Sequence, residues 1–207
     1  MRRLAAIALL LALASVGRAA GPSPLGQAAE RAYRAGQAAG EGGEARRRYQ
    51  EGIGLARQAL ASNPHDPSAL LWLAANLGAE ALTHGKLHAL GVIDEIEQTL
   101  LRLEQDDPAY DHAAAARVLG RLYHKAPALI SVGSNRKAAA FLDEALARAP
   151  DFPGNWAFAA DFYLDRHDCG RARPLGDRVR AARDLDRYGV DAREWREIAA
   201  RVAEACR

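Results

Sequence analysis

The sequence has few of the residues that would point to a specific chemistry. Its 207 residues include two cysteines, one methionine and 6% aromatic residues. It contains no glycine-rich phosphate-binding loop, no HExxH motif and no GxSxG motif. The common nucleotide-binding, metalloprotease and hydrolase classes therefore have no signature here. We predict that the protein is not an enzyme and has no catalytic residues, no cofactor and no metal site.

The chain also lacks a strong excess of charge of one sign. Its formal net charge is +2, and loss of Arg2, Arg3 and Arg18 with an N-terminal signal segment would bring it to about −1. Acidic residues alternate with arginine, as in Asp165-Arg166. Because nucleic-acid-binding domains carry clustered positive charge, we predict no nucleic-acid partner.

Only one long apolar run occurs, between Leu4 and Val16 after Met1-Arg-Arg. About 13 residues are too few for a membrane-spanning helix, which needs roughly 20. Small residues follow at 17 and 19, the pattern that signal peptidase accepts. We expect residues 1–20 to be a signal peptide cleaved near Ala19 or Ala20, giving a periplasmic or secreted protein with no stable membrane insertion. The alternative is an N-terminal membrane anchor.

β-Branched residues are sparse and alanine is abundant, which favours helices over strands. Three segments carry apolar residues at helical spacing. Their stripes are Ala116, Leu119, Gly120 and Tyr123; Ala138, Phe141, Leu142, Ala145, Leu146 and Ala149, stopped by Pro150; and Trp156, Ala159, Ala160 and Tyr163. The first and third stripes share one spacing about forty residues apart, which is typical of repeated helical pairs.

The dipeptides Asn63-Pro64, Asp107-Pro108 and Ala149-Pro150 separate units of nearly equal length. We predict an all-α solenoid of about four helical pairs, at roughly 27–62, 67–105, 109–149 and 153–185, within a repeat domain of residues 27–189. Residues 21–26 are expected to be a flexible lead-in, 87–103 a single helix, and 190–207 a capping helix that covers the last apolar face. Asp66-Pro67 and Asp107-Pro108 are each expected to begin a helix, and Asp191 with Glu194 to form a capping box.

These motifs resemble the tetratricopeptide repeat (TPR). Leu119-Gly120-x-x-Tyr123 is similar to its first-helix signature, and the spacing from Ala138 to Pro150 is similar to its second helix. The resemblance implies a right-handed solenoid of stacked hairpins. The repeat-packing residues are Leu77, Gly78, Leu119, Gly120, Tyr123, Ala138, Leu142, Ala145, Pro150, Trp156, Ala160 and Tyr163. The segment 125–135 makes one turn longer than the usual unit of about 34 residues allows, and this long turn resembles, more weakly, the periplasmic T-component of TRAP transporters.

The TPR resemblance also implies a function, because non-motif positions of the first helices line a concave groove in that family. The groove residues would be Trp72, Arg117, Arg121, His124 and Asp161. Arg117 and Arg121, one turn apart, could together hold a carboxylate. The expected function is a scaffold that binds a protein or peptide, with a homo-oligomer also open. The alternatives are a transporter accessory that binds a small solute, and a helix face that only keeps the protein in solution.

The two cysteines, Cys169 and Cys206, flank two helices of about 22 Å each. An antiparallel hairpin of that shape brings them together, so we predict a disulfide; two unpaired thiols are the alternative. A nucleophile formed by His167 and Cys169 lacks the third group that such a site needs.

His84 and His88 lie four residues apart, with Glu80 one turn earlier. Gly85 between the two histidines marks a predicted turn, and metal ligands in line along one rod do not converge. We interpret the three as polar turn residues.

Overall fold

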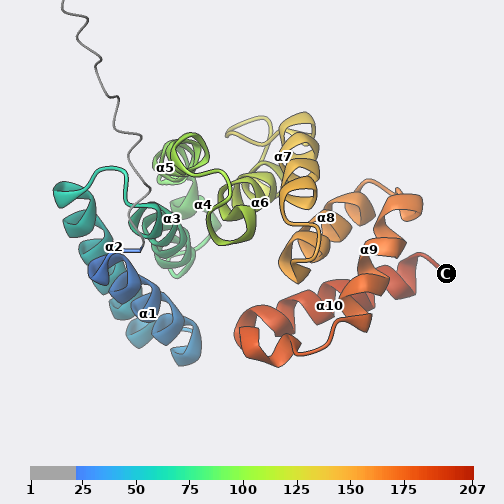
Figure 1. The fold of residues 1–207 in the computed structure, drawn as a ribbon, viewed down its shortest axis with the longest axis horizontal. Helices are drawn as coiled ribbons and strands as arrows, with labels where there is room; N and C mark the ends of the chain where they lie inside the picture. The colour runs from blue at the N-terminus through green and yellow to red at the C-terminus, as the bar shows by residue number, and fades with distance from the viewer. Residues whose placement is uncertain (1–21) are drawn as a thin grey trace, which may run out of the picture.

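The computed structural model describes residues 22–207, apart from the side chain of Lys86, and these residues form helices and connecting turns with no strand. The α-helices are α1 (Pro24–Ala39), α2 (Gly43–Ser62), α3 (Pro67–Leu82), α4 (Lys86–Leu90), α5 (Ile93–Asp106), α6 (Tyr110–Lys125), α7 (Asn135–Arg148), α8 (Pro153–Asp165), α9 (Cys169–Ala181) and α10 (Val190–Ala205), with a short 3-10 helix at Leu185–Tyr188 (Figure 1). None of the helices in this part of the chain is both long and apolar enough to cross a bilayer. The predicted signal peptide, residues 1–20, lies outside the described residues.

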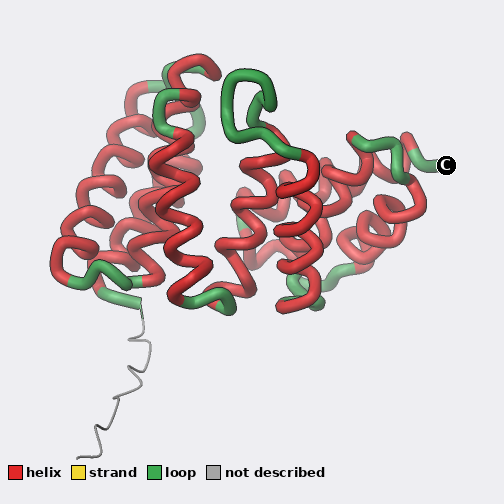
Figure 2. Tube along the Cα trace, turned by 90° about the horizontal axis from the view of Figure 1, so that it is seen from above, coloured by secondary structure: helices red, strands yellow, loops and turns green. Residues whose placement is uncertain are grey.

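The helices pack as four consecutive hairpins, α1/α2, α3/α5, α6/α7 and α8/α9, and α10 packs against α8 and α9. The first helices of the hairpins and α10 form an inner layer, and the second helices form an outer layer (Figure 1). The predicted all-α solenoid with a closing helix is thus confirmed. The turn inside each hairpin lies on one edge of the stack, and the links between hairpins lie on the other (Figure 2). We call the first the hairpin-turn edge.

Small residues let the paired helices approach closely. A Cβ at Gly120 would lie 2.6 Å from Cγ of Leu142, so only glycine fits at the crossing of α6 and α7. Most of the repeat-packing residues are buried: Leu77, Leu119, Gly120, Tyr123, Ala138, Leu142, Ala145, Trp156, Ala160 and Tyr163. Gly78 is half-buried and Pro150 is exposed at the end of its hairpin.

Helix α1 begins three residues earlier than expected, so residues 24–26 of the predicted lead-in are helical. The hydroxyl of Ser23 accepts a hydrogen bond from the Gly26 amide at 2.9 Å, and Pro24 occupies the first turn, where its missing N–H costs nothing. Asp66-Pro67 starts α3 as predicted, since the Asp66 carboxylate accepts from two backbone amides.

Asp107-Pro108 does not start a helix, contrary to the prediction. The amide of Asp107 instead donates to the carbonyl of Leu103, at the end of α5, and α6 begins only at Tyr110. The predicted helix 87–103 is also wrong as a single element, because a turn at Gly91 and Val92 divides it into α4 and α5.

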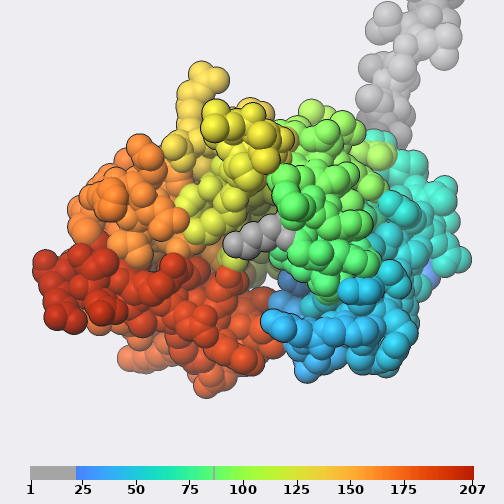
Figure 3. Space-filling model, turned by 180° about the vertical axis from the view of Figure 1, so that it is seen from behind, coloured from blue at the N-terminus to red at the C-terminus, as the bar shows by residue number. Residues whose placement is uncertain are grey.

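The two ends of the stack meet. Gln37 on α1 donates to Asp191 on α10 at 3.4 Å, and Arg34 lies 3.9 Å from the same carboxylate. Figure 3 shows the blue start and the red end of the described chain touching on this face. The predicted capping box is therefore wrong: Gly189 precedes α10 without a side-chain cap, because Asp191 points toward α1.

Cys169 and Cys206 form a disulfide in the structure, with their Cα atoms 5.4 Å apart. The bond joins the start of α9 to the end of α10. It therefore fastens the closing helix to the last hairpin.

Candidate functional site

Arg117, expected in the groove, is only 8% exposed on α6. Its Nη1 donates to the backbone carbonyls of Asp111 at 3.2 Å and His112 at 3.1 Å, and its Nη2 lies 3.4 Å from the Asp111 carboxylate. The guanidinium also lies over the ring of Phe152, 4.6 Å from its centroid. Burial lowers the pKa of Arg117, although the charge of Asp111 opposes this. The partners of this guanidinium belong to the protein itself, so it stabilises the start of α6.

That start has an unusual backbone. Asp111, His112 and Ala113 have φ angles of 44°, 59° and 61°, in the left-handed region that costs non-glycine residues about 1–3 kcal/mol each. Arg117 and the side-chain amide of Asn155 both donate to the carbonyl of His112. The strained turn is thus held by side chains from α6 and α8. No local sequence signal marks it.

Arg121, one turn along α6, faces across to the closing helix. It forms an ion pair with Glu194 on α10, and its guanidinium lies 4.2 Å from the ring centroid of Phe158. Its Nη1 is buried and has no hydrogen-bond partner among the described residues. This nitrogen is therefore enclosed without a partner, while the rest of the guanidinium pairs with Glu194.

Trp72 lies nearby on the inner face of α3 and is half-buried. Its ring packs against Tyr33 on α1 at 5.4 Å, and the guanidinium of Arg34 covers it at 5.5 Å. Burial, together with the negative charge of Asp191, raises the pKa of Tyr33, and the charge of Arg121 opposes this shift. Two residues of α1 thus cover part of Trp72 on the inner face. No pattern in the sequence marks either contact, because both depend on how α1 packs against α3.

His124 and Asp161 belong to a separate charged network between α6, α8 and α10. His124 contacts Asp165 at 2.9 Å, while Asp161 pairs with Lys125 at 2.8 Å and with Arg201 at 2.7 Å. Burial, followed by the charge of Lys125, lowers the pKa of His124. The carboxylates are thus balanced by two cations. The ammonium of Lys125 lies 3.0 Å from Asp165 as well, in the position that a metal ion would need.

The five predicted groove residues therefore all lie on the inner helices, but the structure does not bring them together around one ligand position. Arg117 holds a backbone turn, and His124 and Asp161 form an ion network. Trp72 packs against α1, and Arg121 pairs with Glu194 on the closing helix. An open depression between α1 and α10 is lined largely by polar side chains, including Gln37, Arg193 and Glu197. It is not the deep apolar cavity that a channel for a small solute would require.

A different surface stands out on the hairpin-turn edge. Four of the five large hydrophobic side chains exposed in the described part of the chain lie there, namely Leu82 (60% exposed), Leu87 (84%), Leu129 (98%) and Ile130 (70%). The first two flank the turn between α3 and α4, and the others lie in the long loop between α6 and α7, on the same edge of the stack (Figure 2). We call these four residues the edge patch.

The loop that presents Leu129 and Ile130 is fixed at its base. The amide of Ser134 donates to the carbonyl of Tyr123 at 2.9 Å. Gly133 lies so close to Ala126 that a Cβ on it would be 2.0 Å from the Ala126 carbonyl oxygen. The two legs of the loop are therefore in contact. Sequence analysis missed this patch. The signal that could have found part of it is the apolar pair Leu129 and Ile130, which lies in the extra-long turn and belongs to no helical stripe.

Comparisons with known proteins give limited information. No protein-family model and no curated protein matches the chain. Among solved structures, a thermophilic TPR protein from Thermus thermophilus matches 86% of this chain and 98% of its own, with 22% identity and a TM-score of 0.43. These values are too low to assign a family or a function. The T-component resemblance has no support among these comparisons.

Proposed function

We infer that this protein is a helical-repeat scaffold, without catalytic activity, that binds a partner protein through the edge patch. The observation that carries this proposal is the concentration of exposed large aliphatic side chains at the turns of two successive hairpins. Exposed large apolar side chains that gather in one region of a protein surface are typical of interaction sites, and these four lie on one edge of the stack. Loops held by a rigid framework are the usual place for such sites.

The structure of the long loop supports the proposal. Each fully exposed leucine or isoleucine forgoes about 1.5–3 kcal/mol of burial free energy, which a partner surface can recover. Because the base of the loop is closed by the Ser134–Tyr123 hydrogen bond, less conformational freedom remains to be lost on binding. The part of the patch formed by Leu129 and Ile130 is therefore held in place before a partner binds.

The inner face is the second candidate surface. The Nη1 of Arg121 lacks a partner among the described residues, and this guanidinium could donate a hydrogen bond to a peptide carboxylate. The half-buried ring of Trp72, on the same inner face, could supply an apolar contact. This surface would suit a peptide better than a folded partner, since α1 and α10 meet across its open side.

We also propose that the protein works outside the cytoplasm. The support is the signal-peptide pattern in residues 1–20 and the disulfide between Cys169 and Cys206. Structural disulfides persist in oxidising compartments and are rare in the cytosol.

Site-directed photocrosslinking in cells that make the protein tests the proposal. A photoreactive amino acid is placed at position 129, at position 87, or at the exposed control position Gln58 on α2. We expect one and the same protein adduct from positions 129 and 87 and none from position 58. The double variant Leu129→Asp/Ile130→Asp should abolish binding of that partner and leave thermal stability unchanged, because both side chains are exposed.

Two results would redirect the interpretation. Equal crosslinking from position 58 would mean that the edge patch is not the binding surface. Loss of the partner in Arg121→Met, with binding retained by the Leu129/Ile130 double variant, would move the site to the inner face.

A further inference from the structure

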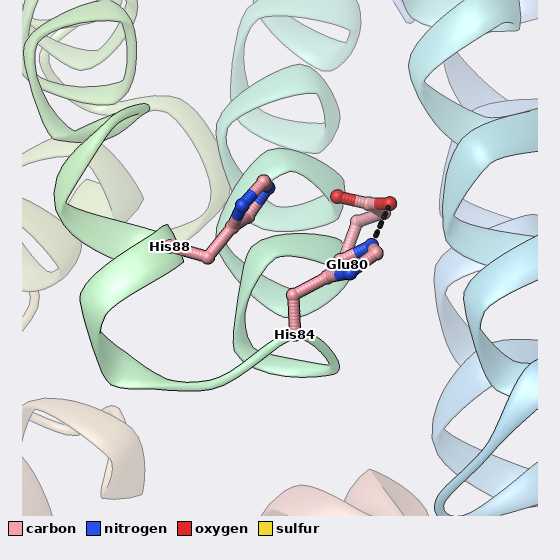
Figure 4. Close-up of side chains that lie close together, drawn as sticks. All are labelled: Glu80, His84 and His88. Carbon is pink, nitrogen blue, oxygen red and sulfur yellow. Dashed lines mark hydrogen bonds and ion pairs between the residues drawn. The ribbon is translucent and has the colours of Figure 1, made fainter.

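The geometry points to a site for a divalent transition-metal ion, of the Zn²⁺ class, formed by Glu80, His84 and His88. It lies where α3 ends and α4 begins, beside Leu82 and Leu87 of the edge patch, and the argument for it does not rest on the proposed partner binding. The ligand atoms that these three side chains offer all lie within 4.8 Å of one another. Figure 4 shows the carboxylate and the two imidazoles gathered beside the turn.

The turn at Gly85 changes the expectation drawn from the sequence. Gly85 has a φ of 102°, in the left-handed region, and the chain leaves α3 there before α4 begins. The two histidines are therefore not in line along one straight helix. Their rings lie side by side, with centroids 4.6 Å apart, and His84 Nε2 is 3.1 Å from Glu80 Oε1. The ligands converge because the helix is interrupted between them.

The donor set and its surroundings suit this class of ion. Two imidazoles and one carboxylate are the ligands of many three-residue zinc sites, in which water completes the coordination. His84 is partly exposed, with a third of its side-chain surface in solvent, so water has access. The amide of Gln50 on α2 donates to Glu80 Oε1 at 3.0 Å. Such an outer contact orients a ligating carboxylate.

Binding of a zinc ion would require the ligand atoms of the three side chains to move slightly closer together. Zinc–ligand bonds of about 2.0–2.2 Å place tetrahedral ligand atoms about 3.4 Å apart, so the widest present separation would close by up to about 1.4 Å. The pair Glu80–His84 already lies within that distance. His88 is therefore the residue that would have to move, and it belongs to a helix of five residues between two turns. Binding would therefore fix α4 against the end of α3.

A second group of three histidine and carboxylate side chains gives a useful contrast. His124, Asp161 and Asp165 are equally close together, but the ammonium of Lys125 bonds to both carboxylates there, at 2.8 and 3.0 Å. That set already contains its cation. Among the described residues, no lysine or arginine forms an ion pair with Glu80.

The test is titration of the purified, EDTA-treated protein, prepared without a histidine tag, with ZnCl₂ by isothermal titration calorimetry. We expect one ion per chain. His84→Gln and His88→Gln should each weaken zinc binding by more than about 100-fold. Loss of a residue that only hydrogen-bonds to a metal ligand typically weakens binding by about 10–100-fold. His65→Gln is the matched control, because His65 is also exposed but pairs with Asp106, elsewhere in the stack.

A second measurement does not depend on affinity. Hydrogen exchange of backbone amides 83–92 should slow on addition of Zn²⁺ in the wild type and stay unchanged in His88→Gln. Circular dichroism checks that each variant is folded. No saturable binding at 100 µM Zn²⁺, full binding by a folded His88→Gln variant, or equal loss in His65→Gln would each overturn the proposal.

Discussion

Replacing Arg117 by methionine separates a structural role for this residue from a role in a binding groove. Methionine keeps much of the side-chain volume but removes the guanidinium. The donors to the carbonyls of Asp111 and His112 are then lost, together with the contact over Phe152. The left-handed turn at the start of α6 would lose its main support.

The size of the effect follows from those contacts. Hydrogen bonds from a charged donor contribute about 1.5–3 kcal/mol each, but some of this is offset because burial of the guanidinium is itself costly. Asp111 is 44% exposed and His112 retains the amide of Asn155 as a donor, so part of the loss is relieved. We expect a net destabilisation of about 3 kcal/mol, which lowers the Tm of a chain of this size by about 6–12 °C.

The assay is thermal unfolding followed by circular dichroism, with Arg121→Met as the matched control on the same helix. Arg121 forms a half-exposed ion pair with Glu194, a kind of contact worth about 0–1 kcal/mol. Hydrogen exchange of amides 110–114 should accelerate in Arg117→Met alone. If the two variants melt within 2 °C of each other, the guanidinium does not hold the turn and Arg117 is again a candidate for ligand binding.

Three further predictions concern packing, the disulfide and pH. A Cβ at Gly52 would lie 2.3 Å from Oδ1 of the buried Asn76, so Gly52→Ala should lower the free energy of unfolding by about 1–3 kcal/mol. A Cβ at Gly54, on the same helix, meets no atom within 4 Å, so Gly54→Ala should raise the free energy of unfolding by about 0.5–1 kcal/mol. Urea denaturation measures both changes. Cys206→Ser removes a disulfide between residues 37 apart and should lower the free energy of unfolding by about 4 kcal/mol. The check is to measure the Tm of the wild-type protein with reductant, which should fall by the same amount as the Tm of the variant. Burial lowers the pKa of His124, so the unfolded chain binds the proton more readily and stability should fall as the pH drops below about 6.5; His124→Gln should flatten that part of the profile.

The repeat architecture could be predicted because it depends on short-range patterns. Apolar residues at helical spacing fix which face of each helix is buried, and prolines at nearly equal intervals divide the hairpins. Gly120 was recognisable because a helix crossing at this distance admits no side chain. Helix lengths and an antiparallel hairpin made a pairing of Cys169 with Cys206 geometrically sensible, with unpaired thiols as the alternative, and the structure contains the disulfide.

The inner face could not be predicted in the same way. Their spacing in the sequence placed Arg117 and Arg121 on one side of α6, but it gave no information on which residues contact that side. Arg117 meets a strained turn six residues earlier in the chain, and Arg121 meets Glu194 on the closing helix. The break at Gly91 was missed for a related reason, since one apolar stripe continues across both α4 and α5.

The closing helix connects these observations. Its apolar side, including Trp195 and Ile198, is buried in the core, which ends the stack as a capping helix must. Its other side carries Asp191 to α1 and Glu194 to Arg121, so the same helix that protects the last hairpin also occupies part of the inner face. The surface that an open repeat would offer to a partner is thereby reduced. The hairpin-turn edge is not covered in this way, because Leu87 and Leu129 remain more than four-fifths exposed. In this stack, whose ends meet, exposed apolar side chains remain at the hairpin-turn edge, and for that reason we propose this edge as the site where a partner protein binds.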